Sequence, residues 1–267
     1  MNINYDLANF PKEGYVVQHL NNSDFLKRFR DIILSKLREI TKNDEITLET
    51  FHKFIIDENE KIDIQFALSK MIWEEKLHFK IIEENIDFYH NLFGKDLDIQ
   101  TKAHLRIARP NCREDNIGFH RDSLYGNGAF EISNFFPLVN LDEKSALQIE
   151  PYSHSRGTIP YTKIENKDVP MGSIKHQLGY PYAPKIIKKE FKIDSYAVPI
   201  NFGQVLILGL GTIHGQDVNT SDITRWSIDI RVKNSFANSN VKDGYYTNLS
   251  SSIISDYAKI YYEACND

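Results

Sequence analysis

Two short stretches, far apart along the chain, carry side chains that could hold a metal ion. His120 and Asp122 stand two residues apart, and alternate side chains of an extended chain project to the same side. His214 lies in a Gly-Thr-Ile-His-Gly stretch much later. If another strand brings His214 beside the first pair, two imidazoles and one carboxylate form a triad that leaves half of an octahedral iron site open for substrate and oxygen.

The pair needs supporting context, because a lone His-x-Asp pattern arises by chance and a single His is more often a core or surface residue. Gly118 and Phe119 precede the pair at the end of a predicted loop. His214 follows a strongly apolar run at 205–208. Both halves therefore lie where barrel strands are expected to end.

A second feature is the alternating stretch that begins at Arg225, eleven residues after His214. Its odd positions are polar and its even positions are apolar, in the order Arg225, Trp226, Ser227, Ile228, Asp229, Ile230, Arg231, Val232. If the polar side lines a barrel interior, a bound dicarboxylate would partner the buried Arg225, and Ser227 would add a donor. The alternative is a half-exposed strand whose polar face is solvated.

The first third of the chain is predicted to be helical. Apolar residues at helical spacing indicate a helix over about 23–42, and a second short helix is expected to start at Asp44 or Thr47. The stretch 62–93 indicates one or two amphipathic helices that end at Gly94.

After Asp96 the pattern changes to alternation, which predicts strands. A strand before Pro110 carries Leu105 and Ile107 on one face and His104 and Arg106 on the other. Further strands are expected at 130–141, 146–150, 195–200, 204–210 and 224–233. Helices first and strands afterwards favour an antiparallel sandwich or barrel with helices packed outside it.

Two stretches remain outside this pattern. The connection at 156–194 is long enough to suggest a lid or a binding loop. The stretch 234–267 is polar and then aromatic, and we expect it to end in a helix that docks back on the body. The predicted organisation is therefore a single domain, with a helical layer over 1–95, a β core over 96–233 and an extension over 234–267.

Composition limits the classes of molecule that this chain is expected to bind. A net charge of -5, with 41% hydrophobic and 26% charged residues, is ordinary for a globular chain and argues against nucleic acid or an anionic membrane as the main partner. We expect a small-molecule partner.

The two cysteines, Cys112 and Cys265, are expected to be reduced thiols. The sequence shows no leader pattern and no apolar run of membrane-spanning length, so a cytoplasmic location is expected.

Three segments, in order and approximate spacing, resemble the phytanoyl-CoA dioxygenase-like branch of the iron(II)/2-oxoglutarate oxygenases. They are 118–122, 146–157 and 214–225, and the resemblance runs from about residue 15 to 232. Its most specific part is a His followed eleven residues later by an Arg on a strand. The middle segment is similar to the family's Leu…Pro-Gly-Ser-His…Gly signature, with Tyr152 in place of the glycine.

This resemblance implies a mainly β fold with flanking helices, built on a double-stranded β-helix core of the jelly-roll, cupin-like kind. It implies iron(II) held by His120, Asp122 and His214, and the distal carboxylate of 2-oxoglutarate gripped by Arg225. In such enzymes 2-oxoglutarate and oxygen are converted to succinate and carbon dioxide while hydrogen is removed from the substrate. Hydroxylation is the default outcome, with desaturation or ring closure as alternatives.

Other polar residues complete the predicted site. Ser133 and Arg106 are candidate contacts of the co-substrate, although a surface ion pair is an equal alternative for Arg106. Arg121, Tyr125 and Arg231 are candidate substrate contacts. They favour a small polar substrate, such as a sugar, an amino acid or a biosynthetic intermediate, over a long acyl chain. His154 is expected to serve its turn, because one more ligand would close a position that the chemistry requires.

Two alternative functions fit part of the same sequence pattern. A cupin-like protein could use the same His and Asp residues for a structural metal, for sugar binding or for isomerisation without oxygen chemistry. Such a protein would be indifferent to 2-oxoglutarate. A nucleic-acid demethylase is disfavoured by the acidic balance and by the lack of a basic stripe in the sequence.

Overall fold

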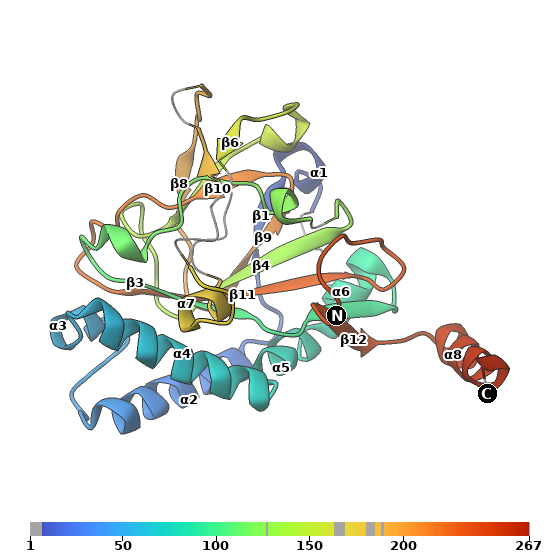
Figure 1. Cartoon of the computed structure of the whole chain (residues 1–267), viewed down its shortest axis with the longest axis horizontal. Helices are drawn as coiled ribbons and strands as arrows, with labels where there is room; N and C mark the ends of the chain where they lie inside the picture. Colours follow the sequence, from blue (N-terminus) through green and yellow to red (C-terminus); the bar gives the residue numbers. More distant parts are fainter. Residues whose placement is uncertain (1–6, 127, 163–168, 180–184, 188–189, 267) are drawn as a thin grey trace.

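The computed structural model describes residues 7–126, 128–162, 169–179, 185–187 and 190–266. Its larger antiparallel sheet contains β1 (Tyr15–His19), β2 (Leu97–Gln100), β3 (His104–Ala108), β4 (Glu131–Pro137), β9 (Gln204–Gly209), β11 (Arg225–Asn234) and β12 (Tyr246–Ser250). The seven strands follow the order β1-β9-β4-β11-β2-β12, with β3 also paired to β11 (Figure 1). Strand β11 is the centre of the sheet, since it pairs with β2, β3 and β4.

The smaller sheet contains β5 (Leu147–Glu150), β8 (Tyr196–Val198) and β10 (Ile213–Gly215), in the order β10-β5-β8. Two short strands, β6 (Tyr161–Thr162) and β7 (Lys185–Ile186), form a separate pair. Antiparallel sheets with flanking helices confirm the predicted mainly β fold of the jelly-roll kind.

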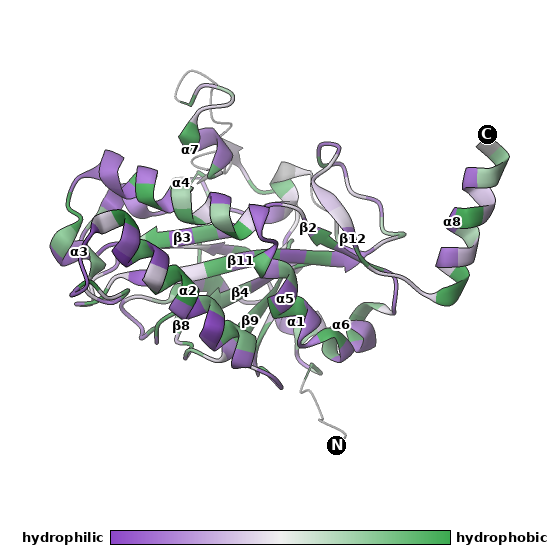
Figure 2. Ribbon diagram, turned by 90° about the horizontal axis from the view of Figure 1, so that it is seen from below, coloured by the Kyte–Doolittle hydropathy of each residue, from purple (hydrophilic) through white to green (hydrophobic). Residues whose placement is uncertain are grey.

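A helical layer covers the outer face of the larger sheet (Figures 1 and 2). It contains α2 (Asp24–Thr41), α3 (Phe51–Phe54), α4 (Glu58–Glu74), α5 (Leu77–Glu83) and α6 (Ile86–Phe93). The apolar side chains of α2 fall at helical spacing and are buried, as Phe29, Ile33 and Leu37 show. The helix α4 begins at Asp57, whose side chain accepts a hydrogen bond from the Glu60 backbone N–H.

The contact between this layer and the sheet sets the orientation of β11. Its even residues Trp226, Ile228 and Ile230 are fully buried in the core shared with the helices. The Trp226 indole N–H donates to the Leu48 carbonyl at 2.8 Å, and the Phe51 ring meets the indole edge-on at 5.2 Å between centroids. The odd residues of β11 therefore face the inside of the sandwich.

Most predicted elements are confirmed, with shifted ends. The first long helix spans α2, and Gly94 ends α6 as expected. The predicted helix from Asp44 or Thr47 is reduced to α3, because Thr47 and Thr50 bond to each other's backbone N–H in a turn. The stretch 62–93 divides into three helices because the left-handed residue Lys76 and a turn at Asn85 interrupt it. Strands β1, β10 and β12 were not predicted.

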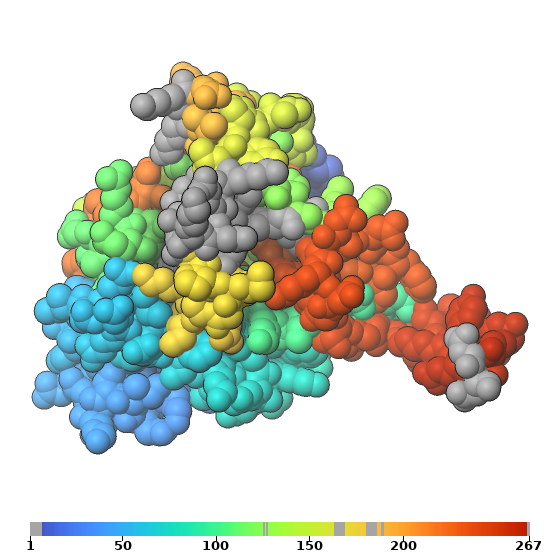
Figure 3. Space-filling model, viewed as in Figure 1, coloured from blue at the N-terminus to red at the C-terminus, as the bar shows by residue number. Residues whose placement is uncertain are grey.

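The end of the chain contradicts one prediction. The helix α8 (Ile253–Asn266) forms, but it does not dock back on the body (Figures 1 and 3). Its large apolar side chains are exposed, from 54% at Tyr261 to 91% at Ile253. The amphipathic pattern predicted the helix correctly. It does not specify whether another part of the chain packs against the apolar face of that helix. Both cysteines are free, as expected. None of the described helices is long and apolar enough to cross a membrane.

Candidate metal centre

His120 and His214 are brought together by backbone pairing between the loop after η1 (Arg113–Asp115) and the strand β10. The His120 N–H donates to the His214 carbonyl at 2.9 Å, and the His214 N–H donates back to His120 at 3.1 Å. Close approach is possible because residue 215 is glycine: a Cβ there would lie 2.7 Å from the Phe119 Cα. The two imidazole centroids end 4.4 Å apart.

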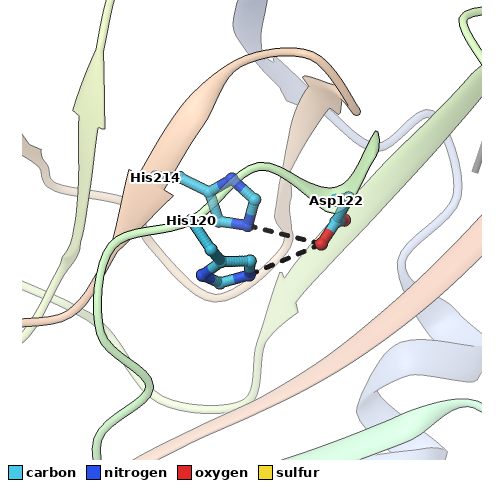
Figure 4. Close-up of side chains that lie close together, drawn as sticks. All are labelled: His120, Asp122 and His214. Atoms are coloured by element: carbon cyan, nitrogen blue, oxygen red, sulfur yellow. Dashed lines mark ion pairs between the residues drawn. The ribbon is translucent and has the colours of Figure 1, made fainter. Parts of the chain in front are cut away.

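Asp122 completes a triad with these two imidazoles (Figure 4). Its Oδ1 lies 3.5 Å from His120 Nε2 and 3.9 Å from His214 Nε2. One donor atom from each residue falls within 4.8 Å of the others, and all three side chains are buried. The predicted juxtaposition of the early pair with the late His is present in the structure.

The second ring nitrogen of each imidazole fixes its tautomer. His120 Nδ1 lies 2.8 Å from the Gly118 carbonyl, and His214 Nδ1 lies 3.0 Å from the Thr212 carbonyl. A carbonyl only accepts, so each Nδ1 carries the proton and each Nε2 keeps its lone pair for a metal. Neutral imidazoles oriented by backbone carbonyls are the usual form of histidine ligands.

The electrostatics of the triad also suit a cation. Burial lowers the pKa of His214 to about 4, with a further lowering from His120, so this imidazole is neutral near pH 7. Burial alone would raise the pKa of Asp122, but the Arg231 guanidinium and then the two neighbouring imidazoles hold that pKa well below its usual range. The site therefore offers one anionic carboxylate and two imidazoles. This donor set fits iron(II) with open positions.

Arg231 contacts the triad directly. Its Nη2 lies 2.9 Å from Asp122 Oδ2, and its Nη1 donates to the Tyr245 hydroxyl. Burial would lower the pKa of Arg231, but Asp122 and the two tyrosines Tyr245 and Tyr246 raise it well above the usual value. The sequence suggested Arg231 as a substrate contact, and the structure places its guanidinium on the Asp122 carboxylate.

A cavity of about 670 Å³ opens beside the triad. It lies between the two sheets, with Leu147 of β5 on one side and Ser133 and Phe135 of β4 on the other. Two connecting segments complete the wall: residues 240–245, and the region after α7 (Ile174–Gln177) up to Gly179. Ser133, a predicted contact of the co-substrate, therefore lies on the cavity wall.

The segment around α7 is tied to the cavity wall and to the helical layer. Arg106 donates to the Leu178 carbonyl at 3.1 Å, and Lys175 forms an ion pair with Glu58 of α4 at 2.9 Å. A Cβ on Gly179 would lie 3.1 Å from the His104 ring. This part of the predicted 156–194 connection thus lies against the cavity.

The inner face of β11 carries the remaining predicted co-substrate residues. Arg225 and Ser227 are buried there, 2% and 0% exposed, and neither is among the described residues that line the cavity. The Ser227 hydroxyl has no hydrogen-bond partner among the described residues. Burial raises the pKa of Asp229, and Arg106, 3.5 Å away, and then Arg225 oppose this rise. The polar face is therefore internal, and the solvated alternative is excluded.

One predicted substrate contact, Arg121, is placed elsewhere. Arg121 does not line the cavity; its guanidinium donates to the carbonyls of Ser153, Arg156 and Gly157 and holds the turn after β5. On an extended chain it projects away from its neighbours His120 and Asp122, which accounts for this. The side chain of Tyr125 lies outside the described residues. His154 Nε2 faces the Pro11 carbonyl at 3.0 Å and serves its turn, as expected.

Sequence reasoning missed three contributors to the cavity. His104 and Tyr245 line it, and burial followed by Arg106 and Arg231 lowers the pKa of His104 well below its usual value. Gln100 also lines it, and its side-chain oxygen accepts from the Arg231 backbone N–H at 3.2 Å. The alternation of β3 placed His104 on the inner face, but the loop that carries Tyr245 has no pattern that points to a site.

Comparison with known proteins identifies solved structures that share this fold. No protein-family model and no curated protein matches the sequence. The non-heme monooxygenase ThoJ in its apo form is 14% identical, with a TM-score of 0.55 over 92% of this chain and 83% of ThoJ. The non-heme alpha-ketoglutarate-dependent carbocyclase SnoK from nogalamycin biosynthesis is 15% identical, with a TM-score of 0.55 over 91% and 89%.

A third solved structure, EvdO2 from Micromonospora carbonacea var. aurantiaca, is 12% identical, with a TM-score of 0.51 over 92% of this chain and 96% of EvdO2. The chain shares its fold with non-heme oxygenase-like enzymes. At such low identity the likeness defines the architecture, and the activity has to be argued from the site itself.

Proposed function

We propose that this chain is an iron(II)- and 2-oxoglutarate-dependent dioxygenase of the phytanoyl-CoA dioxygenase-like branch. The observation that carries the proposal is the buried triad of His120, Asp122 and His214, whose donor atoms converge within 4.8 Å beside a cavity. Both imidazoles are oriented by backbone carbonyls that accept from Nδ1. This is the donor set of non-heme iron oxygenases.

The charge at and behind the cavity wall supports a dianionic co-substrate. Three guanidinium groups, on Arg106, Arg225 and Arg231, lie on the inner face of β3 and β11, with Asp229 on the same face and Asp122 beside Arg231. A divalent ion would add to the positive excess, which a dicarboxylate would offset. In this proposal Arg225 holds the distal carboxylate, and the unpartnered Ser227 hydroxyl adds a donor.

The role of the chain is to hold these groups and to exclude water around them. Iron(II) would be held by the triad, and with 2-oxoglutarate and oxygen it supplies the oxidising power to attack a C–H bond, with release of succinate and carbon dioxide. We propose hydroxylation as the outcome. SnoK is a carbocyclase, so ring closure also occurs on this fold.

The proposed substrate is a small polar metabolite, such as a sugar, an amino acid or a biosynthetic intermediate. Amide, imidazole and ammonium groups line the cavity, on Gln100, His176, Gln177, Asn240 and Lys242. A long alkyl chain would leave such groups unpaired at a cost of about 1–3 kcal/mol each. The cavity volume of about 670 Å³ suits a metabolite together with its co-substrate.

The deciding experiment is anaerobic titration of the iron(II) protein with 2-oxoglutarate. Wild type should develop the weak visible charge-transfer band of a metal-chelated 2-oxo acid, and 2-oxoglutarate with metal should raise its melting temperature. Arg225→Ala should need at least about tenfold more 2-oxoglutarate for either effect. The surface variant Arg28→Ala, on α2, is the matched control and should behave as wild type.

Absence of the band in wild type, together with tight binding of zinc and indifference to 2-oxoglutarate, would favour the non-oxidative cupin-like alternative. If the band is present, a metabolite panel screened for substrate-stimulated succinate release then identifies the substrate class.

A further inference from the structure

The two carboxylate oxygens of Asp122 have different neighbours. Oδ1 faces the two imidazole Nε2 atoms, at 3.5 and 3.9 Å. Oδ2 lies 2.9 Å from Arg231 Nη2 on the far side. Asp122 is only 3% exposed, so bulk solvent barely reaches its carboxylate. The carboxylate is therefore fixed with one oxygen toward the metal position and the other toward a cation.

Arg231 is itself held from several sides. Its backbone lies opposite Ser133 in the β4–β11 register, and its N–H donates to Gln100 Oε1 at 3.2 Å. The guanidinium uses Nη2 for Asp122 and Nη1 for the Tyr245 hydroxyl. Because a guanidinium is planar and rigid, two such contacts fix the direction of the fork.

We propose that Arg231 is a positioning residue for the metal centre, which anchors Oδ2 of Asp122 so that Oδ1 alone is presented to the metal. Tyr245 holds Arg231 in that position and thereby joins the loop at 240–245 to the centre. This inference rests on the metal site of the proposed function. It does not depend on the identity of the substrate.

A competing role for Arg231 is direct binding of 2-oxoglutarate, since it lines the cavity and Arg225 does not. The two roles differ in what they affect. A residue that orients Asp122 changes metal affinity when no 2-oxoglutarate is present. A residue that binds the co-substrate leaves that affinity unchanged and alters only the affinity for 2-oxoglutarate.

The test measures the Kd for cobalt(II) or nickel(II), by competition with a chromophoric chelator, without 2-oxoglutarate. Arg231→Met removes the charge and the donors but keeps a long side chain, and it should weaken metal binding about 10–100-fold. Arg231→Lys keeps the charge and one donor and should recover part of the loss. Tyr245→Phe, which removes one hydroxyl and is expected to fold, should show a smaller loss in the same direction.

The control is Arg225→Met, on the same strand face. It should bind metal within about twofold of wild type but lose 2-oxoglutarate affinity once metal is bound. Equal or tighter metal binding by folded Arg231→Met and Tyr245→Phe would overturn the inference while leaving the proposed function intact. Failure of wild type to bind metal would contradict both the inference and the proposed function. Circular dichroism and melting temperature of the metal-free proteins establish that each variant is folded.

Discussion

At the scale of single residues, burial decides the protonation states on which the site depends. His120 and His214 each give one ring nitrogen to a backbone carbonyl and aim the other at Asp122. An exposed imidazole would be partly protonated at mildly acidic pH and would then repel a cation. Within this fold, burial lowers the pKa of His214 to about 4, so this imidazole is a neutral donor without help from a second carboxylate.

Another buried imidazole allows the same effect to be measured away from the metal. His78 of α5 is fully buried, and its Nε2 lies 3.1 Å from the Gln100 carbonyl. Burial lowers its pKa from 6.5 to about 4, against an opposing contribution from that hydrogen bond. Below pH 6.5, His78 binds a proton in the unfolded chain but stays unprotonated in the folded chain. The free energy of unfolding therefore falls as pH decreases toward 4.

We predict that His78→Gln loses this part of the pH dependence. Between pH 6.5 and 4, the free energy of unfolding of the variant should fall by about 3 kcal/mol less than that of wild type. Urea denaturation at several pH values, with chelator present, measures the difference. Parallel pH profiles for the two proteins would contradict the prediction, whatever the stability offset between them at neutral pH.

The residue scale also shows where sequence reasoning stops. The triad was predictable because alternation fixes the side on which His120 and Asp122 lie, and a strand end carries His214. The sequence predicted Arg121 and Arg231 alike as substrate contacts. Only the tertiary structure places one on a turn and the other on Asp122. Long side chains reach partners that no local pattern specifies.

At the scale of elements, the site depends on how closely β10 approaches the chain at Phe119. The Gly215 position is the tightest point, since an added Cβ would lie 2.7 Å from the Phe119 Cα and 2.9 Å from its backbone nitrogen. Backbone atoms cannot rotate away as a flexible side chain can. The pairing that unites His120 and His214 therefore requires a glycine.

We predict that Gly215→Ala lowers the free energy of unfolding by about 1–3 kcal/mol and weakens metal binding, because the two imidazoles are forced apart. Thermal unfolding and metal titration measure the two effects. Gly157→Ala is the matched control: its added Cβ would meet nothing within 4 Å, so its stability should stay within about 0.5 kcal/mol of wild type. Equal behaviour of the two variants would contradict the proposed role of the close approach.

Elements with long, regular patterns were predicted with the closest bounds, whereas some short strands were missed. Helix α2 and strand β11 have clear periods of 3.6 and 2 over many residues, and both were found within two residues of their ends. Strand β10 has three residues and β1 has five, too few for a period to be distinguished from chance. These short strands are set by pairing with β5 and β9, which is tertiary information.

At the scale of the whole molecule, one core joins the helical layer to the larger sheet. Apolar residues of α2, α4 and β11 share a single buried cluster, while the cavity opens on the other face of the same sheet. The site is thus built on strands held rigid from behind, which suits ligands that must keep their geometry. Helix α8 stands outside this arrangement (Figure 3).

We predict that a chain ending at Ser252, without α8, keeps the melting temperature of the full chain within about 2 °C, since exposed side chains contribute little burial energy. A chain ending at Tyr245 also loses β12, which pairs with β2 and whose Tyr246 hydroxyl donates to Glu131 at 2.6 Å. It should melt several degrees lower, because about 1 kcal/mol corresponds to roughly 2–4 °C at this size. Differential scanning calorimetry of the three chains measures this. A large loss on removing α8 alone would show that the helix packs on the body in solution.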